Sequence, residues 1–307
     1  MTFSMTLEQL RIFLAVAEHL HFTRAAAALY ITQPAVSAAI QALERRYGIP
    51  LFHRLGRRVE LTEAGRWLQE QGQRILSQVQ QLEQGLQDLS NLQVGELHLG
   101  SSLTIGNYWL PYRLSTYKQC YPGIQVRCTL GNTEAICEGV LRGDFDLGLV
   151  EGVIRAADQP HLTQQIIAWD RLSIVVGQKH PWYTRAEVSI PELVETDWVM
   201  REAGSGTQQR FEAALTQWGI PIECLSVSLR VQSGEMIKAL VSQGSAAAAI
   251  SEMMIQNEIR LGDLREVPLA TGSDALQRPF LLLKHRQRYS SRAAQAFEQL
   301  VDPSFRP

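Results

Sequence analysis

The run Thr23-Arg24-Ala25-Ala26-Ala27-Ala28-Leu29-Tyr30-Ile31-Thr32-Gln33-Pro34-Ala35-Val36-Ser37 contains two amphipathic segments joined at a Gln-Pro step. Pro34 suits the first turn of a helix, because the N–H that proline lacks has no partner there. Thr32, just before it, is a residue type that caps helices. Val36, Ile40 and Leu43 then recur at the spacing of a buried helical stripe. The run predicts a helix-turn-helix that fits a DNA major groove, with a plain α-hairpin as the alternative.

The next segment, residues 51–62, favours the DNA-binding interpretation. Leu51 and Phe52 are apolar, Gly56 permits a tight turn, and Val59 and Leu61 alternate as in a short strand. Arginines crowd the predicted turn, so the segment predicts a β-wing that places guanidinium groups against phosphates or a narrow minor groove. The predicted DNA-binding residues of the two segments are Arg24, Thr32, Gln33, Pro34, Ser37, Gln41, Arg54, Arg57 and Arg58.

The charge balance differs along the chain. The 307 residues include 29 Lys and Arg against 31 Asp and Glu, a net charge of −2. Residues 1–65 contain 7 Arg and 5 Glu, so the predicted DNA reader is mildly basic and the remainder is acidic. This balance suits sequence-directed binding by an oligomer better than indiscriminate coating of DNA.

These motifs resemble those of the LysR-type transcriptional regulators of bacteria. The resemblance lies in Thr32-Gln33-Pro34-Ala35-Val36-Ser37, Leu43-Glu44, Leu51-Phe52, Arg54 and Leu61-Thr62-Glu63-Ala64-Gly65, and the layout matches over the whole chain. It implies an α/β protein with an N-terminal winged helix-turn-helix, a long linker helix and a two-lobed effector domain like a periplasmic binding protein. It also implies a homotetramer. Ala38 and Ala39 depart from the longer polar residues of many relatives, so direct base readout is expected to depend on Gln33, Ser37 and Gln41.

Residues 62–92 form the expected linker helix. The segment lacks proline, and apolar residues alternate at spacings of four and three, as in a coiled-coil seam: Leu68, Gly72, Ile75, Val79, Leu82, Leu86 and Leu89. About 30 helical residues span roughly 45 Å, which favours burial against a partner helix over burial on the same domain. We therefore expect a dimerisation helix, with Gly72 leaving a hole in the seam. A dimer places two readers on half-sites one helical turn of DNA apart.

The remaining residues alternate short apolar runs with amphipathic segments, which favours α/β layers with largely parallel sheets. The predicted strands are 96–100, 125–130, 146–150, 172–176, 198–200, 226–231, 246–250 and 280–283, and predicted helices include 109–120, 134–141, 207–218, 234–242 and 292–301. The domains expected are 1–61 for DNA binding, 62–92 for the linker and 93–307 for the effector. The resemblance divides the last into lobe I, 93–165 with 269–307, and lobe II, 166–268.

Two strand-to-helix segments are candidates for holding an effector, because ligands of α/β sheets bind beyond the carboxyl ends of strands and at helix N-termini. They are Ser101-Ser102-Leu103-Thr104 and Arg201-Glu202-Ala203-Gly204-Ser205-Gly206-Thr207. Gly204 and Gly206 let backbone amides form an anion-binding nest, with a plain capped loop as the alternative. With the family's cleft positions, the predicted effector residues are Ser101, Ser102, Thr104, Glu151, Arg201, Gly204, Ser205, Gly206 and Thr207. Glu151 departs from the family and repels an anion unless it pairs with Arg201 or binds a ligand amine. The effector expected is therefore a small anion or a zwitterion.

Other chemistry receives little support. The four cysteines, Cys120, Cys128, Cys137 and Cys224, lack a Cys-x-x-Cys pair, so no zinc site is expected and buried inert thiols are favoured over a 128–137 disulfide switch. No nucleophile elbow or Walker sequence occurs, so neither catalysis nor a cofactor is expected. The partners expected are double-stranded promoter DNA, further copies of the chain, a metabolite and RNA polymerase. No apolar signal core or membrane span is found, which favours the cytoplasm, and Met5 is an alternative start to Met1. An enzyme fused to a DNA-binding domain and an architectural DNA-binder remain as rivals.

Overall fold

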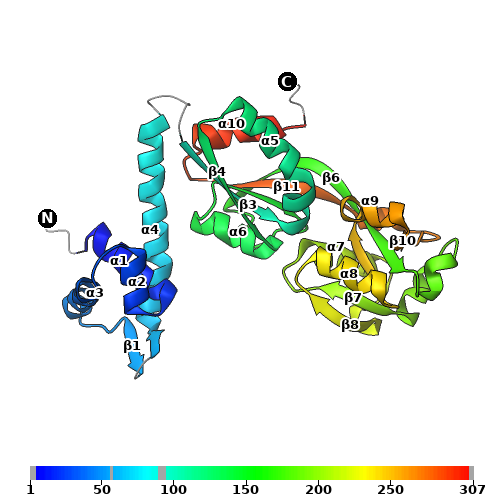
Figure 1. Cartoon of the computed structure of the whole chain (residues 1–307), viewed down its shortest axis with the longest axis horizontal. Helices are drawn as coiled ribbons and strands as arrows, with labels where there is room; N and C mark the ends of the chain where they lie inside the picture. The colour runs from blue at the N-terminus through cyan, green and yellow to red at the C-terminus, as the bar shows by residue number, and fades with distance from the viewer. Residues whose placement is uncertain (1–4, 56–57, 89–94, 304–307) are drawn as a thin grey trace. The chain divides into compact units, whose positions relative to one another are not determined.

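The computed structural model describes residues 5–55, 58–88 and 95–303. Contacts between residues group the chain into two units, Met1–Leu86 and Gln87–Pro307. Both units are drawn in Figure 1.

The first unit begins with three helices, α1 (Leu7–His19), α2 (Phe22–Ala28) and α3 (Gln33–Tyr47). They are followed by the antiparallel pair β1 (Phe52–Leu55) and β2 (Arg58–Leu61) and by helix α4 (Glu63–Asp88). The axes of α2 and α3 differ by 110°, an angle typical of a helix-turn-helix. The apolar core of this first unit includes the predicted stripe of Val36, Ile40 and Leu43. The predicted winged helix-turn-helix is confirmed.

Hydrogen bonds give structural roles to the polar residues of the helix-turn-helix and wing motif. Thr32 is the N-cap of α3, and its side chain accepts a hydrogen bond from the Ala35 amide. The Glu44 carboxylate accepts hydrogen bonds from the amides of Leu51 and Phe52 at 2.8 and 3.3 Å, which connects α3 to the start of the wing. Thr62 Oγ1 donates to the Pro50 carbonyl and accepts from the Gly65 amide. The sequence motif thus encodes the corner where the wing leads into α4.

Helix α4 only partly follows the predicted seam. Leu68 packs against the core of the first unit, and Gly72 is buried where a Cβ atom would lie 2.7 Å from Leu10 Cδ1 of α1. The prediction that Gly72 leaves a hole in a coiled-coil seam is therefore wrong, because this glycine allows close approach of α1. Ile75 and Leu82 are exposed, and Leu89 lies outside the described residues.

The second unit is built on a mixed sheet of nine strands in the described part of the chain, with eight in the order β4-β3-β5-β11-β6-β9-β7-β8 and β10 paired with β6. The strands are β3 (Gly95–Ser102), β4 (Ile124–Gly131), β5 (Leu147–Glu151), β6 (Leu162–Gly177), β7 (Asp197–Arg201), β8 (Ser226–Val231), β9 (Ala247–Ser251), β10 (Leu264–Glu266) and β11 (Gln277–His285). The helices are α5 (Leu110–Cys120), α6 (Thr133–Arg142), α7 (Gly206–Gln217), α8 (Gly234–Gln243), α9 (Glu252–Leu261) and α10 (Arg292–Val301). A π-helical turn, Ile105–Trp109, precedes α5.

Two long strands carry the chain between two lobes. β3, β4 and β5 pair in parallel, as do β7, β8 and β9, but β6 and β11 run antiparallel to their neighbours. The prediction of largely parallel sheets is therefore wrong where the lobes join. We call β3–β5 with α5, α6 and α10 the first lobe, and β7–β10 with α7–α9 the second lobe; β6 and β11 extend through the region between them (Figure 1). Each lobe has its own buried apolar clusters.

The described residues contain no single helix that is both long enough and apolar enough to cross a membrane. The bent pair α2 and α3 passes that test of length and composition only when its two helices are taken together. Those two helices are the helix-turn-helix described above.

Candidate functional sites: the recognition helix and the cleft between the lobes

Helix α3 presents a polar surface from its N-cap, Thr32, to Gln41. Thr32, Gln33 and Gln41 are exposed, and Ser37 is half-buried. Gln33 Nε2 donates a 2.8 Å hydrogen bond to Ser37 Oγ, so the two side chains hold one another in place. Pro34 at the first turn is also exposed. These groups form a surface of the kind that reads base edges in the major groove.

The remaining predicted DNA-binding residues are basic. Arg24 is exposed on α2, the helix that precedes the recognition helix. Arg54 lies in β1 and Arg58 in β2, where the register pairs Arg54 with Val59 and Leu55 with Arg58. Arg57 lies outside the described residues. The two strands form the predicted wing, and the part played by its arginines stays a prediction.

The predicted effector residues of the first lobe are buried. Ser101 and Ser102 end β3, and Thr104 begins the π-helical turn. Ser102 Oγ donates a hydrogen bond to Glu151 Oε2 at the end of β5. Thr104 Oγ1 contacts Met254 Sδ of α9 in the second lobe at 3.8 Å. These hydroxyls therefore face protein groups.

The loop 201–207 meets the first lobe directly. Ser205 is the N-cap of α7, and Gly204 has a φ of +82°, which favours glycine. A Cβ atom on Gly206 would lie 1.8 Å from the Glu151 carbonyl oxygen, so only glycine fits where the lobes touch. The Glu134 amide of α6 also donates to the Gly204 carbonyl oxygen at 3.2 Å. The cleft expected here is closed by contact between the two lobes.

Arg201 pairs with Glu202 and not with Glu151. Its guanidinium donates two hydrogen bonds to its neighbour Glu202, at 2.8 and 3.0 Å. The suggested pairing of Glu151 with Arg201 is therefore wrong, because the chain already supplies a closer partner for each. Arg278 Nη1 lies 3.6 Å from Glu151 Oε1 instead.

Arg278, which the sequence analysis missed, is the centre of a buried polar network. Its Nε donates to Asp170 Oδ2 at 2.8 Å, and its Nη1 donates to Thr207 Oγ1 at 3.0 Å. Ser251 Oγ donates to the other oxygen of Asp170 at 2.8 Å. Arg278 is 0% exposed and Asp170 7%. The available signal was a charged residue next to each apolar strand run, in Arg278-Pro279-Phe280 and in Asp170-Arg171-Leu172.

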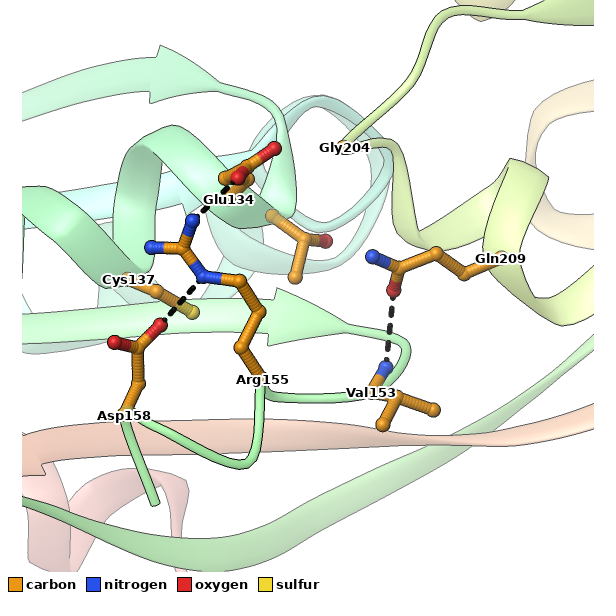
Figure 2. Close-up of a pocket in the computed structure, with 8 residues that line it drawn as sticks. Glu134, Cys137, Val153, Arg155, Asp158, Gly204 and Gln209 are labelled. Atoms are coloured by element: carbon orange, nitrogen blue, oxygen red, sulfur yellow. Dashed lines mark hydrogen bonds and ion pairs between the residues drawn. The ribbon is translucent and has the colours of Figure 1, made fainter. Parts of the chain in front are cut away.

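A pocket of about 80 Å³ opens beside the contact between the lobes. Figure 2 shows its lining residues, which come from α6, from the loop after β5 and from the start of α7. Arg155 lies between Glu134 at 2.6 Å and Asp158 at 2.8 Å, and Gln209 Oε1 accepts from the Val153 amide at 3.1 Å. Of the lining residues, Gly204 alone was among the predicted effector residues. The pocket is acidic, since Arg155 has more than one carboxylate partner.

The cysteines differ from the prediction of buried thiols. Cys137 is buried, and desolvation raises its pKa to about 12. Cys120, Cys128 and Cys224 are exposed, although partial burial of the Cys128 thiol raises its pKa as well. The prediction of buried thiols, made for Cys128 and Cys137, is therefore wrong for Cys128, which lies exposed on β4. In the described ranges, no group of three or more His, Cys, Asp or Glu side chains is placed to hold a metal ion.

The sequence and fold are similar to those of known regulators. Residues 7–66 match the model of the bacterial regulatory helix-turn-helix proteins of the lysR family, and residues 90–306 match the LysR substrate binding domain. The chain is 34% identical over 300 residues to a probable RuBisCO transcriptional regulator of Trichormus variabilis, covering 98% of this chain and 88% of that protein. It is 35% identical to a probable RuBisCO transcriptional regulator of Cyanidioschyzon merolae, covering 96% of each.

Solved structures agree on the fold. Full-length CbnR in complex with its target DNA superposes with a TM-score of 0.71 at 22% identity, covering 97% of this chain and 99% of that one. The regulatory domain of CcmR from Synechocystis, solved with 2-PG, superposes with a TM-score of 0.60 at 22% identity, covering 67% of this chain and 95% of that one. With both family models matched in order along one polypeptide, the chain belongs to the LysR family and is a DNA-binding transcriptional regulator with an effector-binding domain.

Proposed function

We propose that the chain acts as an oligomer that binds promoter DNA through α3 and the wing and changes its DNA binding when a small metabolite binds between the lobes. The observation that carries this proposal is the exposed polar face of α3, at 110° to α2, in a chain that also has a two-lobed α/β unit. The DNA-binding residues proposed are the nine named in the sequence analysis. Promoters of RuBisCO genes are the first targets to test, because the curated relatives are named for them.

Substitutions on α3 and α2 test the DNA-binding half of the proposal. Gln41→Ala should lower affinity for the specific site by about 1–3 kcal/mol and leave non-specific binding unchanged, because a base contact is lost. Arg24→Ala should weaken binding to all sequences and reduce the slope of log K against log salt by about one, because a phosphate contact is lost. Fluorescence anisotropy over a salt series measures both. Equal loss on specific and random DNA for Gln41→Ala would contradict direct readout.

The oligomer proposed is a dimer through α4 that assembles further into a homotetramer. Trp67, Ile75 and Leu82 are exposed along α4, and large apolar side chains exposed along one helix are typical of an interface. The proposed domains stay 1–61, 62–92 and 93–307, with the lobe limits given above. We further propose that the protein works in the cytoplasm and contacts RNA polymerase.

The effector proposed is a small anion or a zwitterion held by Ser101, Ser102, Thr104, Glu151 and loop residues 201–207. An anionic group on the effector is favoured because the glycine loop leads into the N-terminus of α7, where backbone amides attract negative charge. Binding would shift the lobes between existing states and so alter the DNA-binding units. Calorimetry against a metabolite panel, including the 2-PG seen with CcmR, tests this. Binding of only uncharged or cationic compounds would contradict it.

We propose no catalytic role, and two rivals have distinct signatures. An enzyme fused to a DNA-binding domain predicts turnover of a metabolite by the second unit. An architectural DNA-binder predicts no preference among sequences and no metabolite response.

A further inference from the structure

In the proposed effector cleft, the position beside the Ser102 hydroxyl is already occupied by a carboxylate of the chain itself. Glu151 is 3% exposed, and its Oε2 accepts a hydrogen bond from Ser102. Its other oxygen, Oε1, lies 3.6 Å from Arg278 Nη1. A hydroxyl donor on one side and a guanidinium on the other are the partners expected for a bound anion.

The cation in this arrangement lies on a joining strand and contacts both lobes, Glu151 in the first and Thr207 in the second. Arg278 lies on β11, donates to Asp170 on β6 and donates to Thr207 at the start of α7. Its Nη2 lies 2.7 Å from Asp170 Oδ2 but makes no well-aligned hydrogen bond, so this buried guanidinium keeps a donor to spare. Through Arg278, the Glu151 carboxylate of the first lobe is connected to α7 of the second.

Between Ser102 and Arg278, the local charge leaves no place for an anion in addition to the Glu151 carboxylate. Two buried carboxylates, Glu151 and Asp170, face one buried guanidinium, Arg278. Charges shielded from water interact more strongly than exposed ones, and a charge buried without a partner is costly. An added anion between Ser102 and Arg278 would meet both carboxylates.

We propose that Glu151 is an internal surrogate for an effector anion: its carboxylate fills the anion position made by Ser102 and Arg278 and holds the two lobes in contact. This inference rests on the proposed function, because it concerns the same cleft. It makes Glu151 a residue that determines specificity. An external carboxylate enters this position only after the Glu151 carboxylate has left it.

Chemical rescue tests the proposal on the full-length chain. Glu151→Ala removes the CH₂–COO⁻ group, which corresponds to acetate in size and charge. We expect this variant to have a lower Tm than the wild type and to recover it saturably with sodium acetate, with a Kd on the order of 1 mM for so few atoms. Sodium chloride at equal ionic strength should not restore it. The wild type should respond to acetate no more than to chloride, because its site is occupied.

Further variants identify the site and guard against misfolding. Glu151→Gln keeps the side chain's volume, so it should show no acetate rescue, and adding Ser102→Ala to Glu151→Ala should weaken acetate binding by about tenfold, since a hydrogen-bond donor is lost. The matched control is Glu298→Ala on α10, which removes the ion-pair partner of Lys284 on β11. The Tm of this variant should change with acetate no more than with chloride. Glu151→Ser leaves space with a hydroxyl and serves if Glu151→Ala does not fold.

Three results would overturn the proposal. One is specific binding of acetate by the wild type that Ser102→Ala abolishes, since the position would then be open. The second is the absence of any acetate response beyond chloride in both Glu151→Ala and Glu151→Ser. The third is failure of both variants to fold while Glu151→Gln binds acetate. Promoter binding by the wild type, measured on the same preparation, reports separately on the proposed function.

Discussion

Gly65 shows how one residue determines the junction between the wing and α4. A Cβ atom there would lie 2.2 Å from the Leu51 carbonyl oxygen, so the backbone itself would have to move. At Gly72, by contrast, the obstacle is the end of the Leu10 side chain, which can change rotamer. The two glycines lie in the same helix and form a natural comparison.

We therefore expect Gly65→Ala to destabilise the first unit by about 1–3 kcal/mol, as overpacking does, and Gly72→Ala to cost less. Differential scanning calorimetry of the full chain, with operator binding as a second readout, measures the difference. Equal Tm values for Gly65→Ala and the wild type would show that the corner tolerates a side chain.

His180 makes the stability of the second lobe depend on pH. Its Nδ1 accepts from the Trp182 amide at 3.0 Å and its Nε2 lies 2.7 Å from Thr196 Oγ1. Burial lowers the pKa of His180 below its ordinary value of 6.5. The unfolded chain therefore binds a proton more readily than the folded one.

Well above pH 6.5, His180 is neutral in both states and should not change the free energy of unfolding. As the pH falls through 6.5 toward the lower pKa of the folded state, His180 should lower the free energy of unfolding. His180→Asn retains a capping acceptor and should lose this part of the pH dependence. Denaturant unfolding from pH 8 to 5 compares the two. Parallel curves for variant and wild type would rule out His180 as a source of the dependence.

At the scale of elements, helix α4 has a face that packs within the first unit and a face that is exposed. Leu68 and Gly72 pack within the first unit, whereas Leu82 is 66% exposed. Only the exposed side of the helix is available to a second copy of the chain.

Leu82→Lys should weaken dimerisation by at least about tenfold, because burying an unpaired ammonium in an apolar interface is costly. Glu83→Lys introduces the same side chain at the next exposed position and should leave assembly nearly unchanged. Analytical ultracentrifugation over a concentration series distinguishes them. A Leu82→Lys protein that sediments like the wild type would move the interface elsewhere.

At the scale of the whole effector-binding unit, the arginines of the joining strands have different roles. Arg278 is fully buried between Asp170 and Glu151. Arg171 lies next in register on β6, where it is half-exposed and pairs with Glu252 and Glu266. The two side chains carry the same charge in different surroundings.

Arg278→Ala should destabilise the effector-binding unit by about 3–5 kcal/mol, because two buried carboxylates lose their partner. Arg171→Ala should cost about 0–1 kcal/mol, as for exposed ion pairs. Chemical denaturation of the full chain, followed by tryptophan fluorescence, measures both. Similar midpoints for the two variants would mean that the buried network is not required for stability.

Local patterns predict the features that depend on neighbours in the sequence. The cap at Thr32, the stripe of Val36, Ile40 and Leu43, and the glycine loop before α7 follow from spacing and residue type, because helices and turns satisfy their own hydrogen bonds within a few residues. The order of strands and helices in the second unit followed for the same reason. These features account for the winged helix-turn-helix, the linker helix and the α/β class.

Only the tertiary structure decided which charged groups meet. Glu151 and Asp170 come from the consecutive strands β5 and β6, and Arg278 comes from β11, more than 100 residues later, which the sheet order inserts between them. Arg201 was assigned to Glu151 because both were expected in one cleft, but its adjacent Glu202 was closer. Gly72 matched a seven-residue repeat, yet its burial depends on where α1 lies. Periodicity shows which face of an element is apolar, whereas long-range pairing depends on how strands and helices assemble in three dimensions.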